Sequence, residues 1–475
     1  MNAHVSPEGP VSTERSRERL SRLISRGGEW ILVAAFLATP MTSLRLGGSV
    51  TVGDILLTLA SLLALLLLAL RPRLPLSSPW IWSGGAILAL SILVVQVFPP
   101  ASVDALVTSF DGLSYGSSLT TGARLLIAAV VLPVVVSIIV TRWSAIDLLA
   151  RAFILGVSVS CAAALIDAYA GTSIQTSLAA NSDEVTGALI SQPPRYVGLT
   201  GHPNILSLTV VLCLPLVLGR MTSVRGLLLN LPLCVLFLIA ILLSGSRAGL
   251  IGIAMVVVLS LALNPRIRKV ALSLNYRVLS GYAAGLAVAL LLAFVVPVQA
   301  VPIPGVPVSQ SVPGSDDGEG SGGGIAGFSR LDPGSSAAET SDSIRWQYIE
   351  ESVDHILDRP LIGYGYEWIE TSHNIYLQLL LSGGLLALIG YLLVIFGYLR
   401  EIVALRRRVS GPRLDLLIAL AVSILTYLVM GLVSPDLVDR YLYLPAALVL
   451  SMAVLVRSQP EPLAGVKAQA EPSGP

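Results

Sequence analysis

Residues 226–263 read GLLLNLPLCVLFLIAILLSGSRAGLIGIAMVVVLSLAL. Two apolar runs, 226–243 and 246–263, lie on either side of a short turn, and Arg247 carries the one charge in the stretch. A helix of about 20 apolar residues is long enough to cross the hydrocarbon core of a membrane. The stretch therefore predicts two spanning helices joined by a tight turn, with an arginine beside that turn.

The same apolar pattern recurs along the chain. Of the 475 residues, 54% are hydrophobic and 12% are charged, whereas about 25% of residues are charged in soluble domains. Mean hydropathy is +0.80. Continuous apolar runs, without alternation, favour helices over a β-barrel. The sequence predicts an all-α polytopic membrane protein of about 12 transmembrane helices, at 28–46, 51–70, 80–98, 122–140, 145–168, 204–220, 226–243, 246–263, 278–298, 374–398, 413–433 and 439–457.

These helices divide the chain into five predicted segments. They are a basic tail (1–27), helices 1–9 (28–298), a large extracytoplasmic loop (299–373), helices 10–12 (374–457) and a C-terminal tail (458–475). Because the first apolar run leads directly into a second, it is interpreted as a retained helix rather than a signal peptide. The first part of the loop, 302–341, is rich in Pro, Gly, Ser and acidic residues and is expected to be mobile.

The second part of the loop predicts an amphipathic helix over 343–358. Ile349, Val353 and Ile356 recur at helical spacing, and Pro360 ends the run. Candidate N-caps are Ser341, Asp342 and Ser343. We expect this helix to lie on the outer membrane surface, where it can shield a cavity.

The placement of basic residues predicts the orientation. With the N-terminus in the cytoplasm, 21 of the 30 Lys and Arg residues lie on the cytoplasmic side, as the positive-inside rule requires. Both termini are then cytoplasmic, and the long loops face outward from the cytoplasmic (inner or plasma) membrane. A net charge of +1 gives no indication of a nucleic-acid partner. The three cysteines lie inside apolar runs, so neither a disulfide framework nor a metal site is predicted.

Three polar motifs lie where predicted helices meet the outer side. The first is Gly201-His202-Pro203-Asn204, which follows Arg195. The second is Ser244-Gly245-Ser246-Arg247-Ala248-Gly249. The third runs from Arg345-Trp346 through Pro360–Gly365 to Ser372-His373-Asn374. Each motif places polar or cationic side chains beside the end of an apolar helix.

Arginines at these positions depart from the positive-inside pattern. A guanidinium binds phosphate through two hydrogen bonds and stays charged, and Arg247 also opens a helix, where free backbone N–H groups favour an anion. A neutral histidine can take a proton from a hydroxyl, and His373 opens a helix that would hold it rigidly. Arginines for a lipid phosphate or pyrophosphate and a histidine for a hydroxyl predict a glycosyl-transfer site that needs no metal.

Each residue also has a structural interpretation. Arg247 can extend to headgroup phosphates, and Arg345 can pair with the glutamates that follow it on its own helix. Arg195 can be ordinary loop surface, and Arg440 can pair with the aspartates just before it. Helix capping or a position at the membrane interface can explain the polar residues that open predicted helices: His202, Asn204, His373 and Asn374.

Taken in order, the motifs resemble the O-antigen ligase and O-antigen polymerase (Wzy-type) family of bacterial membrane glycosyltransferases. Ser246-Arg247 is similar to a Ser-Arg pair that opens a helix in that family, and Arg345-Trp346 to an arginine-aromatic segment of its large outer loop. Pro360–Gly365 is similar to a P-L-x-G-x-G turn, and His373-Asn374 to an H-N pair. Residues 198–204 resemble a further element of the family. The resemblance covers roughly 195–400, and the 302–341 insertion departs from it.

The resemblance implies transfer of a glycan from an undecaprenyl-pyrophosphate carrier to a hydroxyl acceptor outside the cytoplasmic membrane. It implies that Arg247 and Arg345 hold the pyrophosphate, while His373 acts as base in a metal-independent, inverting displacement. The residues further predicted to contact substrate are Arg195, His202, Asn204, Ser246, Asn374 and Arg440. The implied partners are a lipid-linked glycan donor, a glycan, lipid or protein acceptor, and membrane lipids, with no cofactor. A ligase is slightly preferred to a polymerase, because the Ser-Arg and His-Asn pairs resemble the ligase branch more closely.

Two other classes of function stay open. A transporter or flippase for a lipid-linked or anionic solute also fits 12 helices with cytoplasmic termini. Transporters, however, place ionisable groups near the middle of the membrane and contain internal repeats. Here Asp54 and Arg151 are the main charged residues within predicted helices, and no repeat is visible. A non-catalytic assembly scaffold is the third class.

Overall fold

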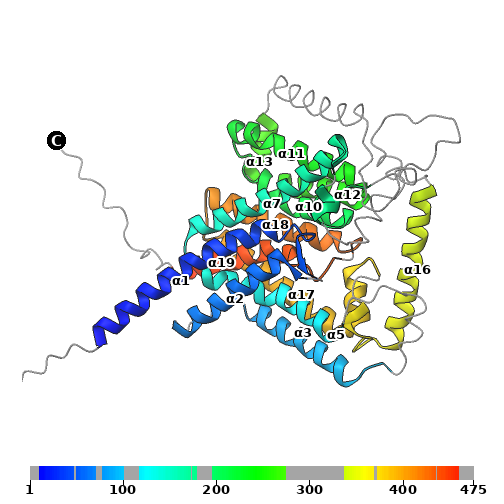
Figure 1. Cartoon of the computed structure of the whole chain (residues 1–475), viewed down its shortest axis with the longest axis horizontal. Coiled ribbons are helices and arrows are strands. Elements are labelled where there is room, and N and C mark those ends of the chain that lie inside the picture. Colours follow the sequence, from blue (N-terminus) through cyan, green and yellow to red (C-terminus); the bar gives the residue numbers. More distant parts are fainter. Residues whose placement is uncertain are drawn as a thin grey trace, which may run out of the picture.

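The computed structural model describes residues 10–47, 50–70, 78–100, 117–172, 174–178, 195–273, 336–368, 372–434 and 436–458, most of them helical (Figure 1). The α-helices are α1 (Pro10–Ala38), α2 (Val52–Leu70), α3 (Pro79–Val97), α5 (Ser118–Leu126), α6 (Leu132–Ile139), α7 (Trp143–Ala170), α8 (Ile174–Leu178), α10 (Pro203–Leu218), α11 (Val224–Ser244), α12 (Arg247–Leu263), α13 (Pro265–Ser273), α16 (Ser336–Asp358), α17 (Ile375–Arg406), α18 (Pro412–Met430) and α19 (Leu444–Ser458). The π-helical segment η1 (Ile127–Val131) and the 3-10 segments η2 (Tyr366–Trp368) and η3 (Arg440–Tyr443) complete the helical part. A short antiparallel ribbon, β1 (Arg45–Gly47) with β2 (Val50–Thr51), lies between α1 and α2.

Eight helical stretches of the described residues are long and apolar enough to cross a membrane. They are α2, α3, the run from α5 through η1 to α6, α7, α11, α17, α18, and η3 with α19. Helices α10 and α12 are apolar but shorter. The predicted helix at 278–298 lies outside the described residues. The structure therefore fits a polytopic all-α membrane protein, while the total of 12 helices stays a prediction.

Three predicted helices differ in their bounds, and the first of them, α1, already begins at Pro10 within the predicted tail. The first, expected at 28–46, ends at Ala38, because Pro40 follows and the residue before a proline disfavours the helical conformation. The second, expected to be continuous over 374–398, is α17, which extends to Arg406 and is broken at Gly383 and Gly384. Gly384 has φ 64° and ψ −160°, a conformation that only glycine adopts readily. The amphipathic helix expected from residue 343 is α16, which begins at Ser336 rather than after one of the predicted caps.

A proline explains the π-helical segment η1. Pro133 has no N–H to donate to the carbonyl of Ala129, four residues earlier, and such a carbonyl needs another donor inside a membrane. The Tyr398 hydroxyl of α17 donates to it at 2.6 Å. A tertiary contact thus compensates for the hydrogen bond that Pro133 removes from the helix.

Glycines bring α3 into close contact with the part of α17 that follows the break. An added Cβ at Gly84 would lie 2.6 Å from the carbonyl oxygen of Gly390, and one at Gly397 would lie 2.5 Å from Cγ1 of Ile81. Small residues allow helix backbones to approach closely in membranes, where packing rather than the hydrophobic effect holds helices together. Figure 1 shows the two helices side by side.

Buried carboxylates join helices at the end of the bundle that we call the Arg406 end, defined by Arg142, Arg266, Arg406 and Arg457. Glu29 of α1 pairs with Arg142 at 2.6 Å, Asp415 of α18 pairs with Arg266 at 2.6 Å, and Glu401 of α17 pairs with Arg457 of α19. In each pair the carboxylate is buried and the arginine reaches the surface. Removing either partner would leave the other charge uncompensated, which costs about 3 to 5 kcal/mol for a buried pair.

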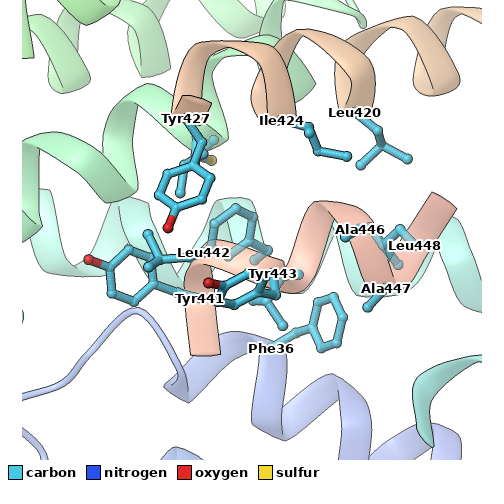
Figure 2. Close-up of a cluster of buried hydrophobic side chains, with 14 of the residues drawn as sticks. Phe36, Leu420, Ile424, Tyr427, Tyr441, Leu442, Tyr443, Ala446, Ala447 and Leu448 are labelled. Atoms are coloured by element: carbon cyan, nitrogen blue, oxygen red, sulfur yellow. The ribbon is translucent and has the colours of Figure 1, made fainter. Parts of the chain in front are cut away.

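The opposite end, which we call the His373 end, carries residues 39–44, 195–204, 244–249, 372–374, 431–434 and 436–440. A cluster of buried hydrophobic side chains from α1, α18, η3 and α19 supports it from inside (Figure 2). There the Tyr427 hydroxyl donates to the carbonyl of Asp436 at 3.2 Å, and the Tyr443 hydroxyl donates to that of Leu437 at 2.8 Å. Helix α16 lies crosswise at this end (Figure 1, yellow). The core thus fixes the segment just before η3.

Candidate active site

His373 lies in the short segment between η2 and α17. It is the one described non-glycine residue with a positive φ, 52°, a left-handed conformation that costs about 1 kcal/mol or more. Asn374, which follows it, is the N-cap of α17: its Oδ1 accepts from the N–H groups of Tyr376 and Leu377 at 3.0 and 3.2 Å. The Nδ2 of Asn374 also donates to the carbonyl of Leu432 at 3.3 Å. Backbone strain at a position held by a firm cap is typical of functional residues.

The surroundings of His373 keep its imidazole neutral. Its ring stacks on Tyr348 of α16, with centroids 6.1 Å apart and planes inclined by 24°. Burial, and next the positive charge of Arg345, lower the pKa of His373 from 6.5 to about 4. Nδ1 of His373 is buried and has no hydrogen-bond partner among the described residues. The ring is therefore stacked on Tyr348, and one of its nitrogens has no hydrogen bond among the described residues.

His202 lies close enough to His373 for their charges to interact. Burial, then Arg195 and His373, lower the pKa of His202 from 6.5 to about 4. Its Nδ1 accepts from the backbone N–H of Asn204 at 3.2 Å, so His202 is the N-cap of α10. The capping interpretation is therefore correct for His202 as it is for Asn374. Capping uses one ring nitrogen of His202. Because His202 begins α10, the N-terminus of this helix lies near His373.

Arg195 links two of the sequence motifs. Its Nε donates to the carbonyl of Ser244 at 2.8 Å, and one of its terminal nitrogens donates to Oδ1 of Asn204 at 3.1 Å. The backbone N–H of Tyr196 donates to the carbonyl of Leu243 at 3.1 Å. These donors occupy carbonyls at the end of α11, which a helix leaves without internal partners. Arg195 thus has a structural role that ordinary loop surface would not have.

Ser246 and Arg247 begin α12 in the same region. The Ser246 hydroxyl is buried and accepts from the N–H of Gly249 at 3.2 Å, so Ser246 is a helix cap. An added Cβ at Gly249 would lie 2.8 Å from Cβ of Ser207, which shows how closely α12 meets the first turns of α10. Arg247 is the first residue of α12 and is partly exposed.

Three helix N-termini therefore meet at the His373 end, those of α10, α12 and α17. The N-terminal end of a helix attracts anions through its free N–H groups and its dipole. The C-terminal ends of α11 and α18, whose carbonyls would repel an anion, lie beside these N-termini. Backbone N–H groups already donate to some of those carbonyls: Tyr196 donates to Leu243 of α11 at 3.1 Å, and Ile375 donates to Gly431 at the end of α18 at 2.8 Å. Together with Arg195, Arg247 and Arg345, this arrangement favours a negatively charged ligand.

The Pro360–Gly365 turn fills the break in α17. The N–H groups of Tyr364 and Gly365 donate to Leu381 and Ser382 at 2.7 and 2.9 Å, and Leu385 donates to Pro360 at 2.8 Å. Gly363 is required because its backbone touches that of α17. An added Cβ at Gly363 would lie 2.6 Å from the Ser382 carbonyl carbon. The turn thus provides partners for backbone groups that the break would leave unpaired, and it fixes α16 relative to α17.

Arg440 forms an ion pair with a residue of another helix. Its Nε lies 2.9 Å from Oδ1 of Asp54, in the first turn of α2. The sequence alternative was a local pair with the aspartates just before Arg440; the ion pair that the structure shows is instead with Asp54, on a helix far along the chain. Asp54 lies in the first turn of α2 and not in its middle; its Oδ2 accepts from the Thr51 N–H at 3.0 Å, and its own N–H donates to the Thr51 hydroxyl at 3.1 Å.

Sequence reasoning did not identify the residues that support the 195–204 segment. The buried carboxylate of Asp167, at the end of α7, accepts from the N–H groups of Ile174 and Gln175 at 2.9 and 2.7 Å. Gln175 in turn accepts from Val197 and Gly198 at 2.7 and 2.8 Å. An aspartate in the last turn of an apolar helix, near a left-handed Gly171, was the signal available in the sequence. Tyr348, three residues after Arg345, was likewise missed.

Known families give an independent comparison. Residues 232–392, or 161 of the 475 residues, match the family model described as O-Antigen ligase. This chain carries an O-antigen ligase domain. The resemblance based on the motifs is thereby confirmed over the matched residues, and the domain indicates a ligase or polymerase function for surface polysaccharide in general. None of the curated proteins matches the sequence.

The O-antigen ligase domain includes some of the predicted site residues and not others. Arg247, Arg345 and His373, the three expected to be catalytic, lie within it, as do Ser246 and Asn374. The remaining residues predicted to contact substrate lie outside the matched range: Arg195, His202, Asn204 and Arg440. Across the described residues, no group of three or more His, Cys, Asp or Glu side chains is placed to bind a metal ion.

Proposed function

We propose that the protein transfers a glycan from a polyprenyl-pyrophosphate carrier, undecaprenyl pyrophosphate in the implied case, to a hydroxyl acceptor on the outer side of the cytoplasmic membrane. The observation that carries the proposal is the setting of His373. It is a neutral histidine with an unbonded nitrogen, placed beside Arg345 and among helix N-termini. The O-antigen ligase domain, which contains this histidine, supports the same chemistry.

In the proposed reaction, a nitrogen of His373 accepts the proton of the acceptor hydroxyl. The acceptor oxygen then bonds to the anomeric carbon, and the bond between that carbon and the pyrophosphate oxygen breaks. The electron pair of the broken bond leaves with the pyrophosphate, and attack opposite the leaving group inverts the anomeric configuration. Arg247 and Arg345 stabilise the charge on the leaving group, because two guanidinium groups match a pyrophosphate in charge and in hydrogen-bond geometry.

The low pKa of His373 is compatible with the role of base. A general base must be unprotonated before the reaction, and a pKa of about 4 keeps the ring neutral at physiological pH. Binding of the anionic pyrophosphate beside Arg345 would offset the positive charge that disfavours the imidazolium. The donor therefore raises the basicity of His373 at the moment when the base is needed.

The experiment is glycan transfer with purified protein. A labelled polyprenyl-pyrophosphate glycan is supplied with candidate acceptors, and wild type is compared with His373→Ala and Arg247→Ala. His355→Ala is the matched control, since His355 lies on α16 and contacts Tyr364 rather than the proposed site. We expect both site variants to lose transfer and the control to retain it. Transfer that persists in both site variants would show that the site is wrong.

A transporter or flippase remains the second candidate, because a broken helix such as α17 is also typical of transporters. In this protein, however, the Pro360–Gly365 turn bonds several of the backbone groups at the break. Sealed vesicles distinguish the two functions. Label that crosses the membrane without a new glycosidic bond would favour transport over the proposed transfer.

A further inference from the structure

A groove at the Arg406 end, far from His373, has no role in the proposed reaction. It has a volume of about 260 Å³ and lies between the end of α12, the second half of α17 and the middle of α18. Its walls are aliphatic side chains, among them Leu263, Leu399 and Leu425, and one charged side chain, Arg406. From Leu417 to Leu425 the lining follows α18 for about 12 Å, at 1.5 Å per residue. The groove is therefore elongated, with a cation near one end.

The charge around the groove is positive and largely uncompensated. Arg406 is exposed and makes no ion pair with the described residues, and Arg407 beside it is exposed as well. On α13, Arg268 and Lys269 are also exposed. The nearest buried carboxylates are already occupied, because Asp415 pairs with Arg266 and Glu401 pairs with Arg457. Of these cations only Arg406 lines the groove, so it alone is placed to bind a headgroup phosphate there.

We propose that this groove binds one anionic phospholipid, with an acyl chain along its aliphatic walls and the headgroup phosphate on Arg406. Both parts of the ligand follow from the structure: the elongated apolar lining fits a hydrocarbon chain, and the guanidinium at its end fits a phosphate. Basic residues beside helices at a membrane surface attract anionic lipids. The site lies in the membrane leaflet opposite to the leaflet that His373 faces, since α18 extends about 28 Å from Pro412 to Met430.

The specific site differs from the general attraction of lipids to a basic surface. Exposed arginines elsewhere at the Arg406 end, such as Arg225 at the start of α11, have the charge but do not line this groove. A bound lipid should therefore depend on Arg406 and on the open groove, and not on Arg225. This contrast provides the matched control.

The experiment uses the full chain in nanodiscs with phosphatidylglycerol that carries a photoreactive group in its acyl chain. After illumination, labelled peptides are identified by mass spectrometry, and unlabelled lipids are added as competitors. We expect labelling within 398–406 and 412–430, with phosphatidylglycerol competing about fivefold better than phosphatidylcholine, which corresponds to one cation near the surface. Arg406→Gln should abolish that preference, and Arg225→Gln should retain it.

A second variant tests the groove rather than the charge. Val403 lines the groove and is exposed, so Val403→Trp should fill the groove without disturbing the core. Labelling of this variant should be reduced even when no competing lipid is added. Equal competition by the two lipids in wild type would overturn the proposal. So would stronger competition by a polyprenyl phosphate, which would make the carrier the occupant. A disulfide between Val403→Cys and a cysteine placed within 278–298 would show that the chain itself covers the groove, and would also overturn it.

Discussion

Replacing Arg345 by glutamine tests whether electrostatics set the basicity of His373. Burial and Arg345 together lower the pKa of that histidine from 6.5 to about 4, which disfavours the imidazolium by about 3 kcal/mol at 1.36 kcal/mol per pH unit. A general base works in its neutral form, so the wild-type rate should fall only as the pH drops towards 4. In Arg345→Gln the midpoint should move up, but stay nearer to 4 than to 6.5, because burial is the larger cause.

The assay is kcat/KM for glycan transfer between pH 4 and 9, since the acidic limb of this parameter reports the free enzyme. Arg345→Gln should also lower kcat/KM at every pH through weaker pyrophosphate binding, so the height and the position of the profile report separate roles. Arg225→Gln removes the same charge at the Arg406 end and should leave the midpoint unchanged. A wild-type midpoint near 6.5, or a midpoint that Arg345→Gln does not move, would refute the reasoning.

Three further predictions concern other parts of the site. Arg247→Lys should lose most transfer, on the order of 10-fold or more, because lysine cannot form the paired hydrogen bonds of a guanidinium; activity equal to wild type would contradict pyrophosphate binding. Gly384→Ala should lower the melting temperature and transfer together, because its φ is 64° and backbone fills the space, whereas Gly27→Ala, with nothing within 4 Å, should do neither. Asp54→Asn should destabilise the fold by about 1 to 3 kcal/mol by leaving Arg440 unpaired, and an exchange of the two charges should restore thermal stability in part.

Hydropathy predicted the bounds of a helix well where a few neighbouring residues encode the turn that ends it. The stretch quoted first was divided into 226–243 and 246–263, and the structure gives α11 ending at Ser244 and α12 beginning at Arg247. A short polar interruption with a glycine and a capping serine contains the needed information in a few residues. The end of the first helix was missed by eight residues, because apolar residues continue after Pro40 although the helix does not.

Features made by distant contacts could not be predicted from the sequence. The break in α17 lies in an apolar run, where Gly383 and Gly384 alone do not exclude a helix; the partner that stabilises it, Pro360–Gly365, comes earlier in the chain. The Asp54–Arg440 pair joins residues nearly 400 positions apart. The motifs did indicate which residues gather at the His373 end, since each opens or closes an apolar helix, and the capping alternative holds for His202 and Asn374.

The Pro360–Gly365 turn bears on what a sequence signature can tell about an enzyme. Its prolyl and glycyl positions are explained by backbone contacts with α17, and none of the described contacts of Gly363 or Gly365 involves His373 or Arg247. A chain that contains this turn and the paired glycines of α17 therefore shares the backbone contact that holds α16 against α17. Proteins that transfer glycans to quite different acceptors could keep this contact unchanged, while the surfaces that select the acceptor vary around it.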